Sequence, residues 1–328
     1  MKSFACEVCS APLYFENSVC VSCGTNLGFM RKGRRIVPVA KDGTHVDADG
    51  HRWRVCANLN LSGCTWLTDT TDRICFSCHL TRTRPSDADA KGLAEFHTAE
   101  EAKRRLITEL DELGLPIIPR SSEPKTGLAF DLLSSTTEKV VTGHHNGVIT
   151  LDLAESNDLH REQLRVAMDE PYRTMLGHFR HEIGHYYWAL LVQGDRLTGF
   201  RELFGDERVS YQDTSEAYYR DGPPKSWRGT SISKYATMHP WEDFAETFAH
   251  FLHICDTLET ASAYGLEAVS EPRDLDNFAD LVTQVWIPLS IALNQINRSM
   301  GKGDLYPFVI PARVIDKLQY VASLVPRT

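Results

Sequence analysis

The chain has 328 residues, 42% hydrophobic and 24% charged, with a formal net charge of −9. It is long enough for two domains with a sizeable core. Its first residues, MKSFACEVCS, contain no apolar run of signal-peptide length, and its most apolar late segment, VWIPLSIAL, is too short to span a bilayer and contains proline. The sequence therefore argues against a secreted or membrane protein and predicts a cytoplasmic one.

Cysteine content and charge change together near Pro85. Eight of the nine cysteines precede this point. Residues 1–84 also carry 11 Lys and Arg against 7 Asp and Glu, whereas the remainder carries 24 against 37. Such a shift is expected at a domain boundary. We predict a cysteine-rich region over 1–84, a linker over 85–92 (PSDADAKG) and a second domain over 93–328.

Two groups of four cysteines have spacings that suit metal better than disulfides. The first group is two CxxC pairs, and the second has one CxxC pair and one irregular pair. Four thiolates complete the tetrahedral shell of a structural Zn²⁺ and leave no position for water. His51 and His79 are near enough to replace a cysteine of the second group, and exchange of pairs between the groups is an alternative. We predict two structural zinc sites, one of Cys6, Cys9, Cys20 and Cys23 and one of Cys56, Cys64, Cys75 and Cys78.

The fold class predicted is α+β, a zinc-ribbon-type β module followed by a mainly helical domain with a small β-sheet. A capping box of Thr98 and Glu101 starts the first helix, and Gly114 ends it. The segment GVITLDL alternates like a strand, and is either an edge that binds an extended peptide or an interior strand. Another strand is expected near residue 130, an irregular stretch over 194–234, and further helices over 169–193, 239–255, 274–298 and 311–323.

The segment HEIGH carries the strongest motif of the second domain. Four residues advance a helix by about 400°, so His181 and His185 project from one face, as two ligands of one zinc ion need. Glu182 lies beside them and can take a proton from a zinc-bound water without ligating the metal. The two histidines need a third protein ligand, which leaves the fourth position for water.

The third ligand does not follow the metzincin pattern HExxHxxGxxH. Trp188 stands where the glycine should be, and Leu191 where the third histidine should be. Acidic residues farther along are therefore the candidates. A ligand on a rigid helix is better preorganised, which favours the acidic helix WEDFAETFAH over the irregular segment. The irregular segment offers Glu202, Asp206 and Glu207.

The run from Tyr235 to Glu246, with Glu242-Asp243-Phe244-Ala245-Glu246 at its end, resembles the second half of the gluzincin site in lethal-factor-like toxins and small gluzincins. The resemblance implies that Glu242 is the third zinc ligand. It also implies that Tyr235 donates a hydrogen bond to the developing oxyanion. Glu246, one turn further, would then orient a ligand histidine.

The whole chain resembles the bacterial zinc-binding metallopeptidases that carry an N-terminal zinc ribbon. The resemblance runs through ACEVCSAPLYFENSVCVSCGTNLGF, CANLNLSGCTWL, ICFSCHLTRTRP, HFRHEIGHYYW and HPWEDFAETFAHFLHI. The resemblance supplies no substrate. Together, the sites above predict a gluzincin-like zinc endopeptidase with one catalytic and two structural zinc ions, acting on a protein or peptide. Two alternatives are a catalytically silent interaction module and a nucleic-acid- or acidic-protein-binding ribbon. The ribbon would use its basic residues, Arg31, Lys32, Arg34, Arg35, Arg52 and Arg54.

Overall fold

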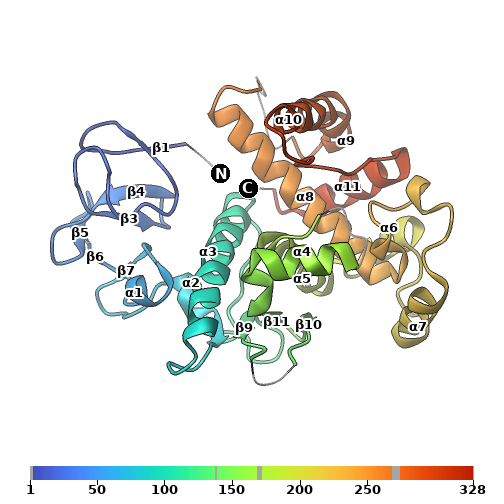
Figure 1. The fold of residues 1–328 in the computed structure, drawn as a ribbon, viewed down its shortest axis with the longest axis horizontal. Helices are drawn as coiled ribbons and strands as arrows, with labels where there is room; N and C mark the ends of the chain where they lie inside the picture. The colour runs from blue at the N-terminus through green and yellow to red at the C-terminus, as the bar shows by residue number, and fades with distance from the viewer. Residues whose placement is uncertain (1–2, 137–138, 168–171, 268–273, 328) are drawn as a thin grey trace. The chain divides into compact units, whose positions relative to one another are not determined.

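The computed structural model describes residues 3–136, 139–167, 172–267 and 274–327 and has the predicted α+β class (Figure 1). The chain divides into two compact units. The first comprises Met1–Glu112 and Pro116–Arg161, and the second comprises Leu113–Leu115 and Glu162–Thr328. None of the described helices is long and apolar enough to cross a membrane.

The cysteine-rich region of the first unit consists of small antiparallel sheets. Its buried apolar residues form small clusters, one of Met30, Val37 and Leu67 and one of Phe15, Phe29 and Trp66. Small cores of this kind are commonly stabilised by metal or cross-links. The sheets pair β1 (Phe4–Ala5) with β2 (Pro12–Leu13), β3 (Leu27–Met30) with β4 (Arg35–Pro38), and β5 (Thr44–Val46) with β6 (Arg52–Val55) and β7 (Leu67–Asp69).

Helix α3 (Ala90–Glu112) starts earlier than the capping box predicts. The Asp89 carboxylate accepts a hydrogen bond from the Gly92 N–H at 2.8 Å, so Asp89 supplies the cap and Thr98 lies inside the helix. The helix takes up residues 90–92 of the predicted linker. The domain boundary near Pro85 stays a prediction, since the first compact unit continues beyond it.

A four-stranded sheet completes the first unit, with strand order β10-β11-β9-β8. The segment GVITLDL forms β11 (Val148–Asp152), which pairs antiparallel with β10 and parallel with β9. It is therefore an interior strand of the sheet, and the alternative prediction of an edge strand is wrong. The other strands are β8 (Thr81–Thr83), β9 (Ala129–Leu133) and β10 (Gly143–His145), and the short helices of this unit are α1 (Leu59–Ser62), α2 (Phe76–His79) and η1 (Leu153–Ser156).

Helices dominate the second unit. The stretch predicted to be irregular contains two of them, α6 (Arg196–Phe204) and α7 (Tyr211–Asp221). Helix α5 (Met175–Leu191) begins at a Thr174 cap rather than at 169, and residues 169–171 lie outside the described part. The remaining helices are α4 (Asp158–Ala167), which starts in the first unit, η2 (Trp227–Gly229), η3 (Tyr235–Thr237), α8 (Pro240–Ala263), α9 (Phe278–Leu281), η4 (Val282–Trp286), α10 (Ile287–Ser299) and α11 (Ala312–Leu324).

Helices α5 and α8 pack closely because α5 has a glycine at the contact (Figure 1). A Cβ on Gly184 would lie 2.9 Å from the Ala245 Cα, 3.1 Å from the Ala245 carbonyl oxygen and 3.2 Å from the Phe248 Cβ. Backbone atoms cannot move aside as a flexible side chain can. Gly184 therefore sets the distance between the helix that carries HEIGH and the helix that carries Glu242.

We expect Gly184→Ala to destabilise the second unit by about 1–3 kcal/mol, because the added methyl group overpacks this contact. Chemical denaturation monitored by circular dichroism measures the change. Gly229→Ala is the matched control, since a Cβ there meets no atom within 4 Å. Equal stability of the two variants would show that α5 and α8 do not depend on the small residue.

Candidate active site and metal centres

Three predicted ligands converge between α5 and α8. The His181 Nε2 lies 3.0 Å from the Glu242 Oε2, and the His185 Nε2 lies 3.5 Å from the same oxygen. One donor atom from each of the three residues lies within 4.8 Å of the other two. Glu242 is buried with 3% of its surface exposed, while the two histidines are partly exposed. The cluster is therefore open on the histidine side.

The donor set of this cluster fits zinc. Nitrogen and oxygen ligands about 2.1 Å from a tetrahedral Zn²⁺ lie about 3.4 Å from one another. The two separations of 3.0 and 3.5 Å lie close to this value. Two imidazoles and one carboxylate also leave one of the four positions for water or substrate, as in catalytic zinc sites.

Glu246 holds His181 from the side opposite the cluster. The His181 Nδ1 lies 2.8 Å from the Glu246 Oε1, and the Ser233 hydroxyl donates to the Glu246 Oε2 at 2.6 Å. Burial opposes ionisation of Glu246, but the hydrogen bond and charge of His181, with smaller contributions from His250 and Ser233, together outweigh it and keep the carboxyl pKa below its usual value. An Nδ1–H that donates to this carboxylate leaves the Nε2 lone pair of His181 for a metal.

Glu182 is buried beside the cluster, with 7% of its surface exposed. Burial raises its pKa, and the nearby histidines only partly oppose the effect. A carboxylate with a raised pKa is a stronger base than one in water. This is the property that a general base in hydrolysis needs.

Two tyrosines border the cluster, of which the sequence indicated one. The Tyr235 ring lies 5.9 Å from the His181 ring, and burial with the charge of Glu242 raises the Tyr235 pKa, so its hydroxyl stays protonated. The Tyr211 hydroxyl donates to the Glu242 Oε1 at 3.0 Å and fixes the second oxygen of that carboxylate. Tyr211 was missed because it starts α7, in the stretch predicted to be irregular.

The alternative acids of the irregular segment are engaged elsewhere. Glu207 pairs with Arg201 at 2.5 Å, and Asp206 pairs with Arg208 at 2.7 Å. Glu202 is exposed on α6. Among the described residues, the acid that the structure groups with both histidines is Glu242.

Each predicted cysteine group forms a cluster in the first unit. The Sγ atoms of Cys6 and Cys23 are 3.8 Å apart, and those of Cys9 and Cys20 are 3.6 Å apart. Thiolates about 2.3 Å from a tetrahedral Zn²⁺ lie about 3.8 Å from one another, whereas a disulfide has its sulfurs about 2 Å apart. In the second group, Cys56–Cys78 and Cys64–Cys75 are 3.6 and 3.5 Å apart.

The pairs are not exchanged between the groups, and neither nearby histidine replaces a cysteine in these clusters. The His51 Nε2 lies 2.7 Å from the Asp69 Oδ2. His79 ends α2 and lines a surface hollow with Arg82 and Arg120.

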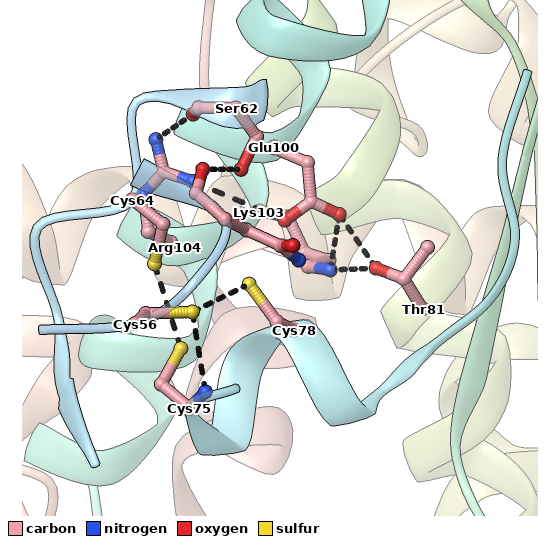
Figure 2. Close-up of polar contacts among 10 residues, drawn as sticks. Cys56, Ser62, Cys64, Cys75, Cys78, Thr81, Glu100, Lys103 and Arg104 are labelled. Carbon is pink, nitrogen blue, oxygen red and sulfur yellow. Dashed lines mark hydrogen bonds and ion pairs between the residues drawn. The ribbon is translucent and has the colours of Figure 1, made fainter. Parts of the chain in front are cut away.

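A buried polar network adjoins the second cysteine group (Figure 2). The Lys103 ammonium, which is fully buried, donates to the Glu100 Oε1 at 2.5 Å, and the Thr81 hydroxyl bonds the same oxygen. Arg104 donates to the Ser62 carbonyl oxygen at 2.9 Å. Since Ser62 lies between Cys56 and Cys64 and Thr81 follows Cys78, these bonds tie α3 to a segment inside the cysteine group and to the segment after it.

The comparisons with known proteins agree with this geometry. Residues 92–324 match the family described as "Putative zinc-binding metallo-peptidase", and residues 3–89 match a zinc-ribbon domain family. The chain therefore belongs to this metallopeptidase family and carries an N-terminal zinc ribbon.

Similar proteins occur in mycobacteria. Proteins of Mycobacterium bovis and of two strains of Mycobacterium tuberculosis, each named as an uncharacterized protein, are 53% identical over 333 residues. The matches cover 99% of this chain and 95% of each relative. No solved structure matches the chain.

The two cysteine groups differ in burial, which predicts that they lose zinc and react with alkylating reagents at different rates. Cys9 and Cys23 are exposed, whereas all four cysteines of the second group are buried. We expect elemental analysis to find three zinc ions per chain, and expect chelator with a thiol-alkylating reagent to modify Cys9 and Cys23 before Cys64 and Cys75. Mass spectrometry of the digested protein measures the order. One tightly bound zinc, or the reverse order of alkylation, would contradict the two-site prediction.

Removal of the Glu242 side chain should weaken zinc binding at the histidine site more than removal of the Glu246 side chain. Glu242→Ala should strip zinc from the histidine site because it deletes a ligand. Glu246→Ala should lower zinc affinity or activity about 10–100-fold because it deletes the support of His181. Zinc titration with a competing chromophoric chelator measures both, with Glu216→Ala on exposed α7 as the control. Greater loss of zinc in Glu246→Ala than in Glu242→Ala would place the ligand one helical turn further along.

Proposed function

We propose that this protein is a zinc endopeptidase that hydrolyses peptide bonds at the cluster of His181, His185 and Glu242. The observation that carries the proposal is the convergence of these three side chains beside a buried Glu182. Membership of the metallopeptidase family supports it independently.

His181, His185 and Glu242 would hold the catalytic zinc. Zinc bound there supplies a Lewis acid that polarises the scissile carbonyl and lowers the pKa of a coordinated water. Glu182 takes a proton from the attacking water as the bond to the carbonyl carbon forms. It then gives that proton to the amine nitrogen as the C–N bond breaks, which returns the carboxylate to its starting state.

Tyr235 would donate a hydrogen bond to the carbonyl oxygen as negative charge develops on it. Its raised pKa keeps the phenol protonated at neutral pH, which this role requires. Tyr211 would act indirectly, by fixing the Glu242 carboxylate through its 3.0 Å hydrogen bond. The site thus separates the group that carries the proton, Glu182, from the group that donates a hydrogen bond to the oxyanion, Tyr235.

The basic cluster after the first cysteine group gives little support to nucleic-acid binding as an alternative. Arg31 donates to the Asp111 carboxylate at 2.6 Å, Arg34 donates to the carbonyl oxygen of the same residue at 3.1 Å, and Arg35 pairs with Glu7 at 3.2 Å. These contacts compete with phosphate for the guanidinium groups. The cluster therefore has a role within the first unit.

Glu182→Gln should keep zinc at the histidine site and lower hydrolysis about 10²–10⁴-fold, since the variant loses the base but none of the ligands. Turnover of a fluorogenic peptide library, with and without a chelator, measures the loss, and elemental analysis measures zinc. Glu216→Gln is the control. Turnover that survives in Glu182→Gln and still disappears with chelator would assign the base to another group.

A further inference from the structure

An open hollow of about 550 Å³ lies on the four-stranded sheet of the first unit, away from any residue assigned a role above. Its lining includes Arg82, Arg120, His144, His145 and Thr150, and contains no Asp or Glu. A smaller hollow of about 260 Å³ shares both arginines and adds His79. In a chain with 44 acidic and 35 basic residues, an acid-free lining with two arginines is a departure from the general composition.

The hollow lies over the polar face of the sheet. Side chains alternate along β9 and β11, so the apolar residues Phe130, Leu132, Ile149 and Leu151 share the fully buried face. Asp131 and Thr150 are register partners on the opposite face. Thr150 lines the hollow on this face together with Arg82 and Arg120. The hollow therefore offers one hydroxyl and two guanidinium groups to a ligand.

Internal hydrogen bonds hold both guanidinium groups in place. The Asp131 carboxylate accepts two bonds from Arg82, one of them from Nε at 2.9 Å. Arg120 donates from Nη1 to the Asn146 carbonyl oxygen at 2.7 Å. A guanidinium has five N–H donors, so each arginine has donors beyond those used in these bonds. Fixed arginines lose less conformational entropy when they bind an anion.

The charge of Arg120 is the more available of the two. Asp131 pairs directly with Arg82, whereas Arg120 bonds to an uncharged carbonyl group and feels the Asp131 charge without a direct bond. The planar fork of a guanidinium matches the two oxygens of a carboxylate. The hollow is therefore suited to an anion that Arg120 binds directly and Arg82 supports through its remaining donors.

We propose that this hollow, the Arg82–Arg120 hollow, binds a carboxylate of an acidic peptide segment. The choice of a peptide rests on the proposed function, since a peptidase needs a surface that selects its substrate. A nucleic acid carries a charge on every phosphate, so the acidic excess of residues 85–328, 37 acidic against 24 basic residues, repels it more strongly than it repels a single carboxylate. The edge strand β10 contributes Gly143, His144 and His145 to the lining, beside which an extended segment can lie.

The test measures binding without cleavage, in full-length zinc-loaded Glu182→Gln protein. A fluorescent peptide of alternating Glu and Ala is compared, by anisotropy at low and high salt, with the same peptide carrying Gln in place of Glu. We expect the Glu peptide to bind more tightly, with an affinity that falls as salt rises. Arg120→Gln should weaken binding about tenfold, as loss of one charge-assisted bidentate contact does. Arg73→Gln, at an exposed arginine of the first unit that lines neither hollow, should change it less than about twofold.

A second variant covers the case in which Arg120→Gln does not fold, as judged by circular dichroism and zinc content. The double variant Arg82→Gln with Asp131→Asn removes the other guanidinium without leaving an unpaired buried carboxylate, and should also weaken binding. Equal binding of the Glu and Gln peptides, or equal effects of Arg73→Gln and Arg120→Gln, would overturn the proposal. Arg120-dependent binding of a single-stranded oligonucleotide without binding of the Glu peptide would also overturn it. None of these results depends on hydrolysis, so failure of the binding proposal can be distinguished from failure of the proposed peptidase activity.

Discussion

The close approach of α5 and α8 at Gly184 and Ala245 is the constraint on which the candidate active site depends. Each helix carries a polar side chain three residues before this contact and another one residue after it. The contact therefore sets two pairs of side chains against each other at once, and a wider helix spacing would separate both pairs. The pairs are His181 with His185 on α5, and Glu242 with Glu246 on α8.

The same packing buries three carboxyl groups beside two histidines. Neutral histidines carry no positive charge that could balance the carboxylates. Glu182, Glu242 and Glu246 lie around two imidazoles, and burial opposes the ionisation of all three carboxyl groups. A divalent cation held by the cluster would offset most of this charge. The hydrogen bonds from Ser233 and Tyr211 orient the carboxylates, but they bring no positive charge.

The first unit is held together in a different way. Its small sheets bury their apolar residues in small clusters, so the two cysteine groups and the buried bonds of α3 supply links that a larger core would otherwise provide. All four cysteines of the second group are buried, whereas two of the first group are exposed. Many arginines of this unit are engaged in internal bonds, and Arg120 combines a bond to an uncharged carbonyl group with a place in the lining of the Arg82–Arg120 hollow.

Sequence alone determined the features that depend on residues close together in the chain. Cysteine spacing indicated both groups of four, and helical periodicity placed the two histidines of HEIGH on one face; the part played by Glu242 came from a resemblance rather than from spacing. Tertiary structure decided what depends on distant segments. The interior place of β11, the bond from Tyr211 to Glu242 and the meeting of Arg82 with Arg120 all join parts of the chain that no local pattern connects. The reason is physical: propensity and periodicity act over a few residues, whereas strand pairing and helix contacts are chosen by the packing of the whole unit.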